Sequence, residues 1–449
     1  MRKQDNAKIP QAFFIPEADH ILKQRCKEAL REQYRNAVAP FIQKRLEQEL
    51  KWIKKCKLSS LMLLASKVIP AIESYDLEIY ALPPLNGSFV AYLLGITEIN
   101  PLPPHFHCPY CDYAAKWPEV ADAWDCIYEE TSCPRCGKHG GVEGHNLSLA
   151  ALSAFAPEGD TDQTMPFSFA ITAKYFYEAL TIILDEVQKQ TQYFKLVLKH
   201  QESAKHVISE HQAWLVPASE YENPERREQI HQAPPIPREN CIYDMVCFYP
   251  LSPQLFLTQE EMSFPLIALQ PDQTRRSMDD SEMRLECAHF FLKNTNIPEW
   301  ILMSEEHKAK LPEMNQALGN LHFSTLVKAQ GLLSCSTLWT HELRGALNAG
   351  MITERNILVC RDDFWEFFRS YGVSDKQTRK IIWEMRHRQW DVPPRKLEMM
   401  LSKYAIPEYY REICLKTTWL CSRSSLLFDA ILTMRKTRYT NYAGSFDDV

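Results

Sequence analysis

The chain has 449 residues, a length that suits two to four domains. Hydrophobic residues make up 45% and charged residues 24%, a composition typical of soluble globular proteins. Its net charge of −6 is uneven, because residues 1–60 and 375–440 each hold 14 Lys and Arg against 7 Asp and Glu. No apolar run reaches the roughly 18–20 residues that a membrane span requires, and the N-terminus lacks the apolar stretch of a secretory signal. We therefore expect a cytoplasmic protein without membrane contact.

Residues 18–57 carry two apolar stripes with helical spacing and predict two amphipathic helices. The stripes consist of Leu22, Cys26, Ala29 and Leu30, and of Phe41, Ile42, Leu46, Leu50 and Ile53. Residues 61–82 contain a short apolar run. The six prolines between residues 83 and 109 predict loops after that run.

The remainder of the chain mixes helical and strand patterns. Residues 172–212 have the pattern of one or two long helices, and residues 216–239 predict an exposed linker rich in Pro, Glu and Arg. Apolar and polar side chains alternate over 240–272, which predicts short strands. From about residue 283 the pattern is helical in many short pieces. The whole predicts an α+β, mostly helical fold.

Two CxxC pairs, HCPYC and CPRCGK, are separated by 21 residues and contain Cys108, Cys111, Cys133 and Cys136. Two such turns can place four thiolates at the corners of a tetrahedron, and a closed four-cysteine shell is structural rather than catalytic. The spacing therefore predicts a structural Zn²⁺ ion held by a zinc ribbon. The other ten cysteines are scattered singly, which favours reduced thiols over disulfides.

The flanks of this module resemble the PolC-type DNA polymerase III alpha subunit, the family C replicase of many Gram-positive bacteria. GSFVAYLLGITEINPLPPHFHCPYC is similar to the family segment that joins a Gly/Ser-rich loop to paired CxxC motifs. A family-like helix precedes that loop at 40–53, and further family-like segments follow in the same order at 323–350, 360–386 and 405–421. The resemblance runs from about residue 20 to residue 440 and covers the polymerase core alone.

This resemblance implies a bacterial protein of DNA replication with a nucleotidyltransferase-type palm, a thumb and fingers, into which the zinc ribbon is inserted. The expected layout is N-terminal helices and the first part of the palm at 1–104, the zinc ribbon at 105–145, a palm strand region at 146–170, a reduced helical thumb and linker at 171–235, the second part of the palm at 236–285 and helical fingers at 286–449.

Nucleotidyl transfer needs carboxylates that hold two Mg²⁺ ions, and the family presents two aspartates in a strand of the form PDIDLNFS. The matching stretch, GDTDQTMPFSFA, has Thr164 and Pro166 at those two positions. Asp160 and Asp162 lie nearby, but a shift of two to four residues along a strand moves a side chain ~7–13 Å. The motif of the third aspartate is also lost, which leaves Asp279 and Asp280 as weak candidates. Mg²⁺ is therefore expected only if the protein is active.

The family's glycine-rich nucleotide loop also differs here. GSRGSVGSS corresponds to YALPPLNGS, in which Leu82 replaces the arginine and Pro83 and Pro84 lack N–H donors. The whole chain has only 13 glycines, although phosphate-cradling loops depend on glycine. The resemblance thus implies a polymerase-core homologue that has lost nucleotidyl transfer.

Three functions remain open at the level of sequence. The first is binding of DNA or a replisome partner by an inactive core, with candidate DNA contacts at Lys195, Lys205, Arg361, Arg386, Arg388 and Arg423. The second is an active DNA polymerase with displaced carboxylates. The third is a protein-interaction decoy of the host replicase, which the acidic middle of the chain would suit. Lone basic residues are also common on solvated helix faces, so charge alone does not decide.

Overall fold

The computed structural model describes residues 15–149 and 313–431 together with several segments between them. The gaps within the two long stretches are 36–37, 76, 78, 112, 119, 126–131, 315, 319–321, 336, 354–355, 388–393 and 418–419. The intervening segments are 167–172, 176–190, 194–200, 211–217 and 243–248, with a few isolated residues between 222 and 228.

Three helices open the described part of the chain. α1 spans Ala18–Tyr34, α2 spans Pro40–Lys55 and α3 spans Ser59–Glu73, so both helices predicted within 18–57 are confirmed. The predicted stripes supply their buried side chains, among them Leu22, Cys26, Leu30, Ile42, Leu46 and Ile53. Helix α3 is apolar on most of its surface because it packs against α1, α6 (Phe176–Gln190) and the edge of a sheet.

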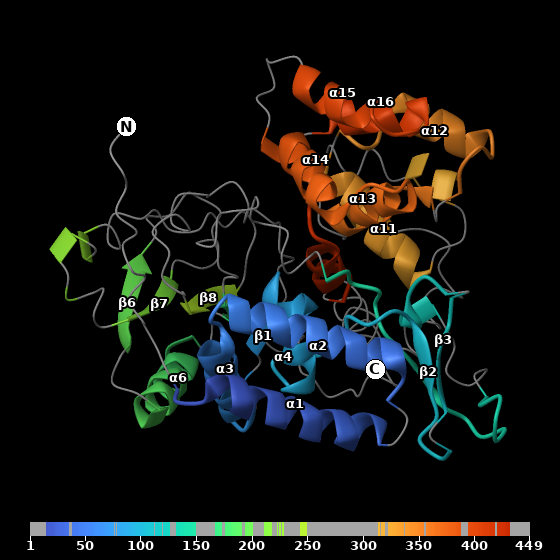
Figure 1. Cartoon of the computed structure of the whole chain (residues 1–449). Helices are drawn as coiled ribbons and strands as arrows, with labels where there is room; N and C mark the ends of the chain where they lie inside the picture. The colour runs from blue at the N-terminus through green and yellow to red at the C-terminus, as the bar shows by residue number, and fades with distance from the viewer. Residues whose placement is uncertain are drawn as a thin grey trace, which may run out of the picture.

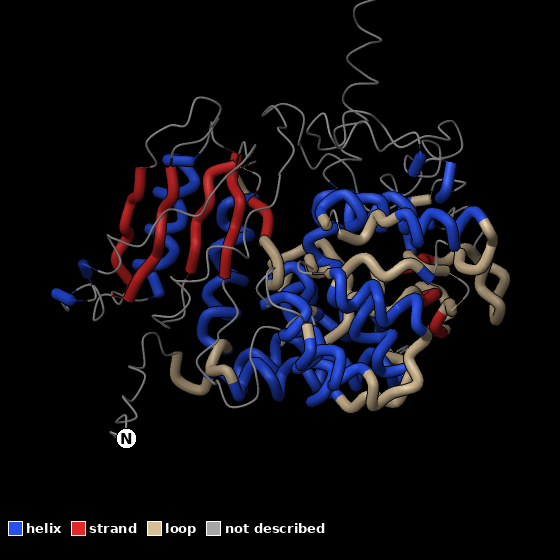
Figure 2. The backbone as a smooth tube through the Cα atoms, turned by 90° about the horizontal axis from the view of Figure 1, so that it is seen from above, coloured by secondary structure: helices blue, strands red, loops and turns tan. Residues whose placement is uncertain are grey.

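A five-stranded sheet lies beside these helices (Figure 1). Its strands are β1 (Ile79–Ala81), β5 (Phe167–Thr172), β6 (Phe194–His200), β7 (His211–Pro217) and β8 (Tyr243–Phe248). The order across the sheet is β1-β5-β8-β7-β6, antiparallel except for the β7–β8 pair. Helices α3 and α6 both contact the sheet and one another, and Figure 2 shows helices covering one of its faces.

The helical prediction for residues 172–212 is correct for α6 and wrong beyond it. Strand β6 begins at Phe194, and β7 follows in the same sheet as β1, β5 and β8. The sequence FKLVLKH is compatible with a strand, because Phe194, Leu196 and Leu198 recur at a period of two and both lysines fall on the opposite face, although its apolar content also suits a helix. The short strands predicted within 240–272 are confirmed for β8; residues beyond 248 in that range lie outside the described residues.

The cysteine module contains a small antiparallel sheet of three-residue strands. β2 (His105–His107) lies between β3 (Ala114–Lys116) and β4 (Gly141–Glu143). The strands meet so closely that Gly140 has no room for a side chain, since a Cβ there would lie 2.2 Å from Cζ of Phe106. Such short strands bury little surface on their own, so the module depends on its surroundings.

The C-terminal part is helical, as predicted. Its main helices are α11 (Phe323–Ser334), α12 (His341–Asn348), α13 (Arg361–Ser370), α14 (Asp375–His387), α15 (Arg395–Leu401) and α16 (Glu408–Lys416). They share one hydrophobic core with the cysteine module, whereas α1 to α3, α6 and strands β1 and β5 share another. Among the described residues, no helix is both long and apolar enough to cross a membrane.

Candidate functional site

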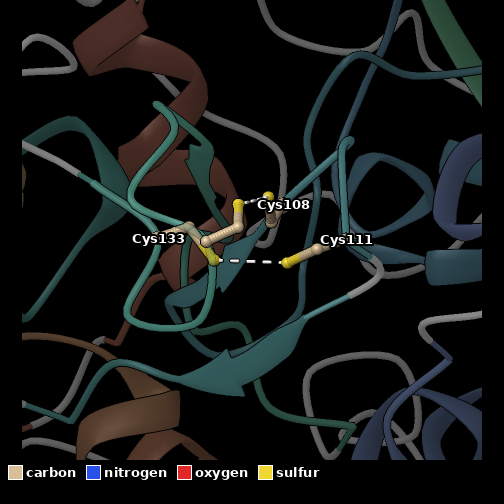
Figure 3. A group of neighbouring side chains, drawn as sticks. Cys108, Cys111 and Cys133 are labelled. Atoms are coloured by element: carbon tan, nitrogen blue, oxygen red, sulfur yellow. Dashed lines mark hydrogen bonds between the residues drawn. The ribbon is translucent and has the colours of Figure 1, made fainter.

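Four cysteines converge at one end of the small sheet (Figure 3). Their sulfur atoms all lie within 4.8 Å of one another, with 3.6 Å between Cys108 and Cys136 and 3.4 Å between Cys111 and Cys133. Strand β2 delivers the first pair directly, because Cys108 follows its last residue. Within the described residues this is the only group of three or more His, Cys, Asp or Glu side chains close enough to share a metal ion.

The backbone around the second pair is arranged to favour a thiolate. The amide of Arg135 donates to Sγ of Cys133 at 3.3 Å, and Gly137 closes the turn with a φ of +71°. Burial opposes ionisation of Cys133, but the amides of Cys136 and Arg135 together with the thiols of Cys111 and Cys108 lower its pKa to about 7. Burial raises the pKa of Cys111 to about 12, and the neighbouring thiols add to the effect.

These four residues fit a tetrahedral metal ion. A Zn–S distance of about 2.3 Å implies sulfur–sulfur separations of roughly 3.8 Å, close to those observed. A thiolate-only donor set selects a soft or borderline cation, and the shell has no open position for a reacting water. The neighbouring His105 and His107 are buried but do not join the group.

A second candidate site is the loop at residues 82–88, which the resemblance aligns with a nucleotide loop. It forms η1 (Leu85–Gly87) and leads into α4 (Phe89–Leu93). The amides of Asn86, Gly87 and Ser88 donate to carbonyl groups within the loop at 3.0–3.3 Å. Pro83 and Pro84 have no N–H group to offer.

The next amides of this loop are bonded to a buried carboxylate. Glu49 is 0% exposed and accepts from the amides of Phe89 and Val90 at 3.0 and 3.1 Å, and from Oγ of Ser88 at 2.8 Å. Arg45, one helical turn away on α2, donates to Glu49 at 2.5 Å. Every amide from 86 to 90 therefore has a partner inside the protein.

The same loop packs against the C-terminal part. Nδ2 of Asn86 donates to the carbonyl of Ser424 at 3.3 Å, and a Cβ on Gly87 would lie 3.3 Å from Cβ of Ser424. Arg45 further connects the loop with residue 147, because it donates to the carbonyl of Leu147 at 2.7 Å and to that of Gly87 at 3.3 Å. The loop is therefore in direct contact with residue 424 at residues 86 and 87.

Two neighbouring carboxylates on α13 connect the segment that follows the cysteine module with the C-terminal part. Asp362 accepts from the amide and hydroxyl of Ser148 at 3.2 and 2.9 Å, and from the amide of Arg423 at 2.8 Å. Asp363 accepts from the amide of Val359 at 2.9 Å and pairs with the Arg423 guanidinium at 3.5 Å.

A second carboxylate cluster holds the cysteine module against α11. Nδ1 of His145 lies 2.9 Å from Asp122, and both side chains are buried. Asp125 accepts from the amide of Ser324, the second residue of α11, at 2.8 Å. Burial raises the pKa of Asp125 to about 6, and the charge of Asp122 adds to the effect. The Trp124 and Phe323 rings pack beside these groups, with centroids 4.7 Å apart.

Two of the predicted DNA contacts are buried in this structure. Arg361 is 6% exposed, and its amide donates to the carbonyl of Cys421 at 2.9 Å. The Arg423 side chain is 12% exposed and is paired with Asp363. These positions favour a structural role for both side chains over contact with a DNA backbone.

Two other predicted DNA contacts lie on described elements, and the remaining ones and the predicted carboxylates do not. Arg386 is half-buried on α14, and Lys195 lies on β6 opposite Val216. The following predicted residues lie outside the described part of the chain: Lys205, Arg388, Asp160, Asp162, Thr164, Pro166, Asp279 and Asp280.

The buried charges at residues 45, 49 and 362 were not predicted from the sequence. One signal was available for the first two, because Arg45 and Glu49 are four residues apart beside the apolar stripe of α2. No local pattern signals Asp362, whose partners are more than 60 positions away in sequence.

The known proteins that this chain resembles are bacterial DNA polymerase III proteins. The family described as bacterial DNA polymerase III alpha NTPase domain matches residues 20–116. DNA polymerase III PolC-type from Thermotoga petrophila is 23% identical over 455 residues, covering 90% of this chain and 33% of the relative. The PolC-type polymerase of Caldanaerobacter subterraneus is 20% identical and covers 96% of this chain and 34% of the relative.

The similarity is stronger over a shorter stretch. DNA polymerase III PolC-type from Thermotoga maritima is 32% identical over 158 residues, which is 35% of this chain and 11% of the relative. The chain thus spans at most about a third of the length of these curated relatives.

Proposed function

Because the chain is PolC-like along nearly its whole length, we propose that it acts in DNA replication or its regulation by binding DNA, and that it does not transfer nucleotides. The binding half rests on the relationship to replicative polymerases and on the basic N- and C-terminal regions. The proposed metal is a structural Zn²⁺ held by Cys108, Cys111, Cys133 and Cys136.

The hydrogen bonding of the loop at residues 82–88 is the main support for the proposal that nucleotide transfer is lost. Backbone amides bind a triphosphate only when they are unpaired and can approach the phosphate oxygens. Here two prolines have no amide, and those from 86 to 90 already have partners. Thr164 and Pro166, at the aligned positions of two metal-binding aspartates, support the same proposal because neither can carry the negative charge that two Mg²⁺ ions need.

Primer extension tests the catalytic half directly. We expect no nucleotide incorporation by the purified chain on a primer–template with either Mg²⁺ or Mn²⁺. Incorporation that is abolished by Asp160→Ala or Asp280→Ala would instead identify an active polymerase with displaced carboxylates.

Filter binding to the same primer–template over a salt series tests the DNA-binding half. We expect affinity that falls as salt rises, because phosphate contacts release counterions. An absence of salt-dependent binding would contradict this half. Recovery of replisome proteins after nuclease treatment would then favour the protein-interaction alternative.

A further inference from the structure

The outer turn of the cysteine module carries an exposed tyrosine surrounded by cations. Tyr110 lies between the ligand positions 108 and 111 and is 63% exposed. Nζ of Lys138 lies over its ring, 4.6 Å from the centroid. Arg135 donates to the carbonyl of Cys111 at 3.3 Å, and Arg35, at the end of α1, donates to the carbonyl of Pro109 at 2.9 Å. Three cations from two segments, the second CxxC turn and the end of α1, thus converge on residues 109–111.

These cations have no acidic partner among the described residues. The ion pairs of the described chain involve other basic side chains, and Arg35, Arg135 and Lys138 are all exposed. A guanidinium has five N–H donors, and each of the two arginines uses one on a backbone carbonyl. Donors therefore remain for an anionic partner.

We propose that Tyr110, Arg135, Lys138 and Arg35 form a contact site for single-stranded DNA. An exposed aromatic ring can stack on an unpaired base, and neighbouring cations can hold the adjoining phosphates. A duplex offers phosphates but no unstacked base, so the ring selects a single strand. The site deepens the proposed DNA-binding function and rests on it.

A simpler role for the cations is to offset the negative charge of a zinc ion bound by four thiolates. That role predicts that removal of the cations lowers the zinc content of the protein but leaves the DNA affinity of the zinc-loaded protein unchanged. It also gives no reason for the ring of Tyr110 to be exposed, since a tyrosine between two ligands can equally pack inward. The two roles are therefore separable by experiment.

The test uses the full zinc-loaded chain and a fluorescent oligodeoxythymidine, with affinity measured by anisotropy over a salt series and zinc content measured on each sample. We expect Tyr110→Leu to weaken binding at least about fivefold and Tyr110→Phe to bind like the wild type, because stacking needs the ring and not the hydroxyl.

The double variant Arg135→Ala/Lys138→Ala tests the cations. It should weaken binding and reduce the slope of log affinity against log salt concentration by about 1.4, which corresponds to two phosphate contacts on a single strand. The charge-matched control is Lys189→Ala/Arg369→Ala, at exposed positions on α6 and α13 outside the two basic regions, and it should bind like the wild type.

Two results would overturn the site. One is wild-type affinity in the Tyr110→Leu and double variants at full zinc content. The other is weakening only in samples that have also lost zinc, which would assign the cations to the metal centre. The proposed function can be judged separately. If the wild type binds primer–template while these variants are unaffected, this site alone fails; if the wild type binds no DNA, both proposals fail.

Discussion

Buried charged side chains, rather than apolar ones alone, fix the local structure around both candidate sites. Glu49 is fully buried and accepts four hydrogen bonds, including one from Arg45. Asp125 and Asp362 hold helices of the C-terminal part through backbone amides. A buried carboxylate is tolerated only when its lone pairs are satisfied, so removal of either side of such a pairing is costly.

Glu49→Gln should destabilise the protein by about 3–5 kcal/mol, because the new amide group faces donors and Arg45 is left without a counter-charge. The measurement is the midpoint of urea unfolding. Glu47→Gln is the matched control on the same helix. Glu47 is exposed, and its side chain accepts from Gln43 at 2.7 Å, its one side-chain hydrogen bond to the described residues. The effect of this change should therefore stay within about 0.5 kcal/mol. Equal effects of the two changes would contradict the role of Glu49.

Asp125→Asn should stabilise the protein at neutral pH, because the asparagine oxygen can still accept from the amide of Ser324 while the buried negative charge beside Asp122 is removed. The folded-state pKa of Asp125 is raised to about 6 from 3.8, so the wild type loses stability as pH rises from 3.8 to 6 and the folded carboxyl gives up its proton. The asparagine does not ionise, so its advantage should be absent near pH 3.8, grow to about 1–3 kcal/mol above pH 6 and then level off.

Chemical unfolding measured between pH 4 and pH 8 checks this expectation for Asp125. The control is Asp185→Asn on the exposed side of α6, where Asp185 pairs with Lys189 at 2.7 Å. That variant should show no gain at pH 7. A constant difference between Asp125→Asn and wild type across the whole range would contradict the assigned titration.

At the scale of elements, the cysteine module is a set of strands too short to stand alone. Its small sheet is completed by two contributions, the four thiols at one end and the Trp124–Phe323 contact with α11 at the other. A bound metal would therefore act as part of the module's core, since the free energy of metal binding becomes free energy of folding.

Cys111→Ser should abolish one equivalent of bound zinc and lower the thermal midpoint, because a hydroxyl does not replace a thiolate in the tetrahedral shell. Metal analysis and thermal unfolding with and without a chelator measure the two effects. Cys56→Ser is the control, since Cys56 is a half-buried free thiol outside the group. An unchanged zinc content in Cys111→Ser would exclude this site as the zinc centre.

At the scale of the whole molecule, two hydrophobic cores meet along polar contacts. Residues 147 and 148 lie at this junction: Arg45 of α2 binds the carbonyl of Leu147, and Asp362 of α13 binds Ser148. The hydrogen bond from Asn86 to the carbonyl of Ser424 is a further polar contact between the two parts. The two parts are thus held together by directional bonds, which lose their strength when a single partner is removed.

Asp362→Ala should weaken the junction and make the two cores unfold in separate steps, because three hydrogen bonds lose their acceptor. Calorimetry would show a broadened or split transition. Ser148→Ala removes only one of these bonds and should lower stability by about 1 kcal/mol without splitting the transition. A single sharp transition in Asp362→Ala would contradict this role, because it would show that the remaining contacts are enough to couple the cores.

The sequence by itself determined the features that repeat locally or have a fixed spacing. Helices α1 and α2, the helical C-terminal part and the strand character of β8 follow from periodicity, and the four-cysteine group follows from two CxxC turns. The relationship to PolC-type polymerases was also evident in the segments around the cysteines.

Only the tertiary structure decided the strand state of β6, because its short apolar run suits a helix or a strand until a neighbour supplies hydrogen-bond partners. It likewise decided that Arg361 and Arg423 are buried and that Asp362 joins Ser148 to Arg423. A basic or acidic residue has the same local signal on a surface and in a buried pair. Its role depends on which distant segment folds against it, and that contact is not encoded in any local pattern.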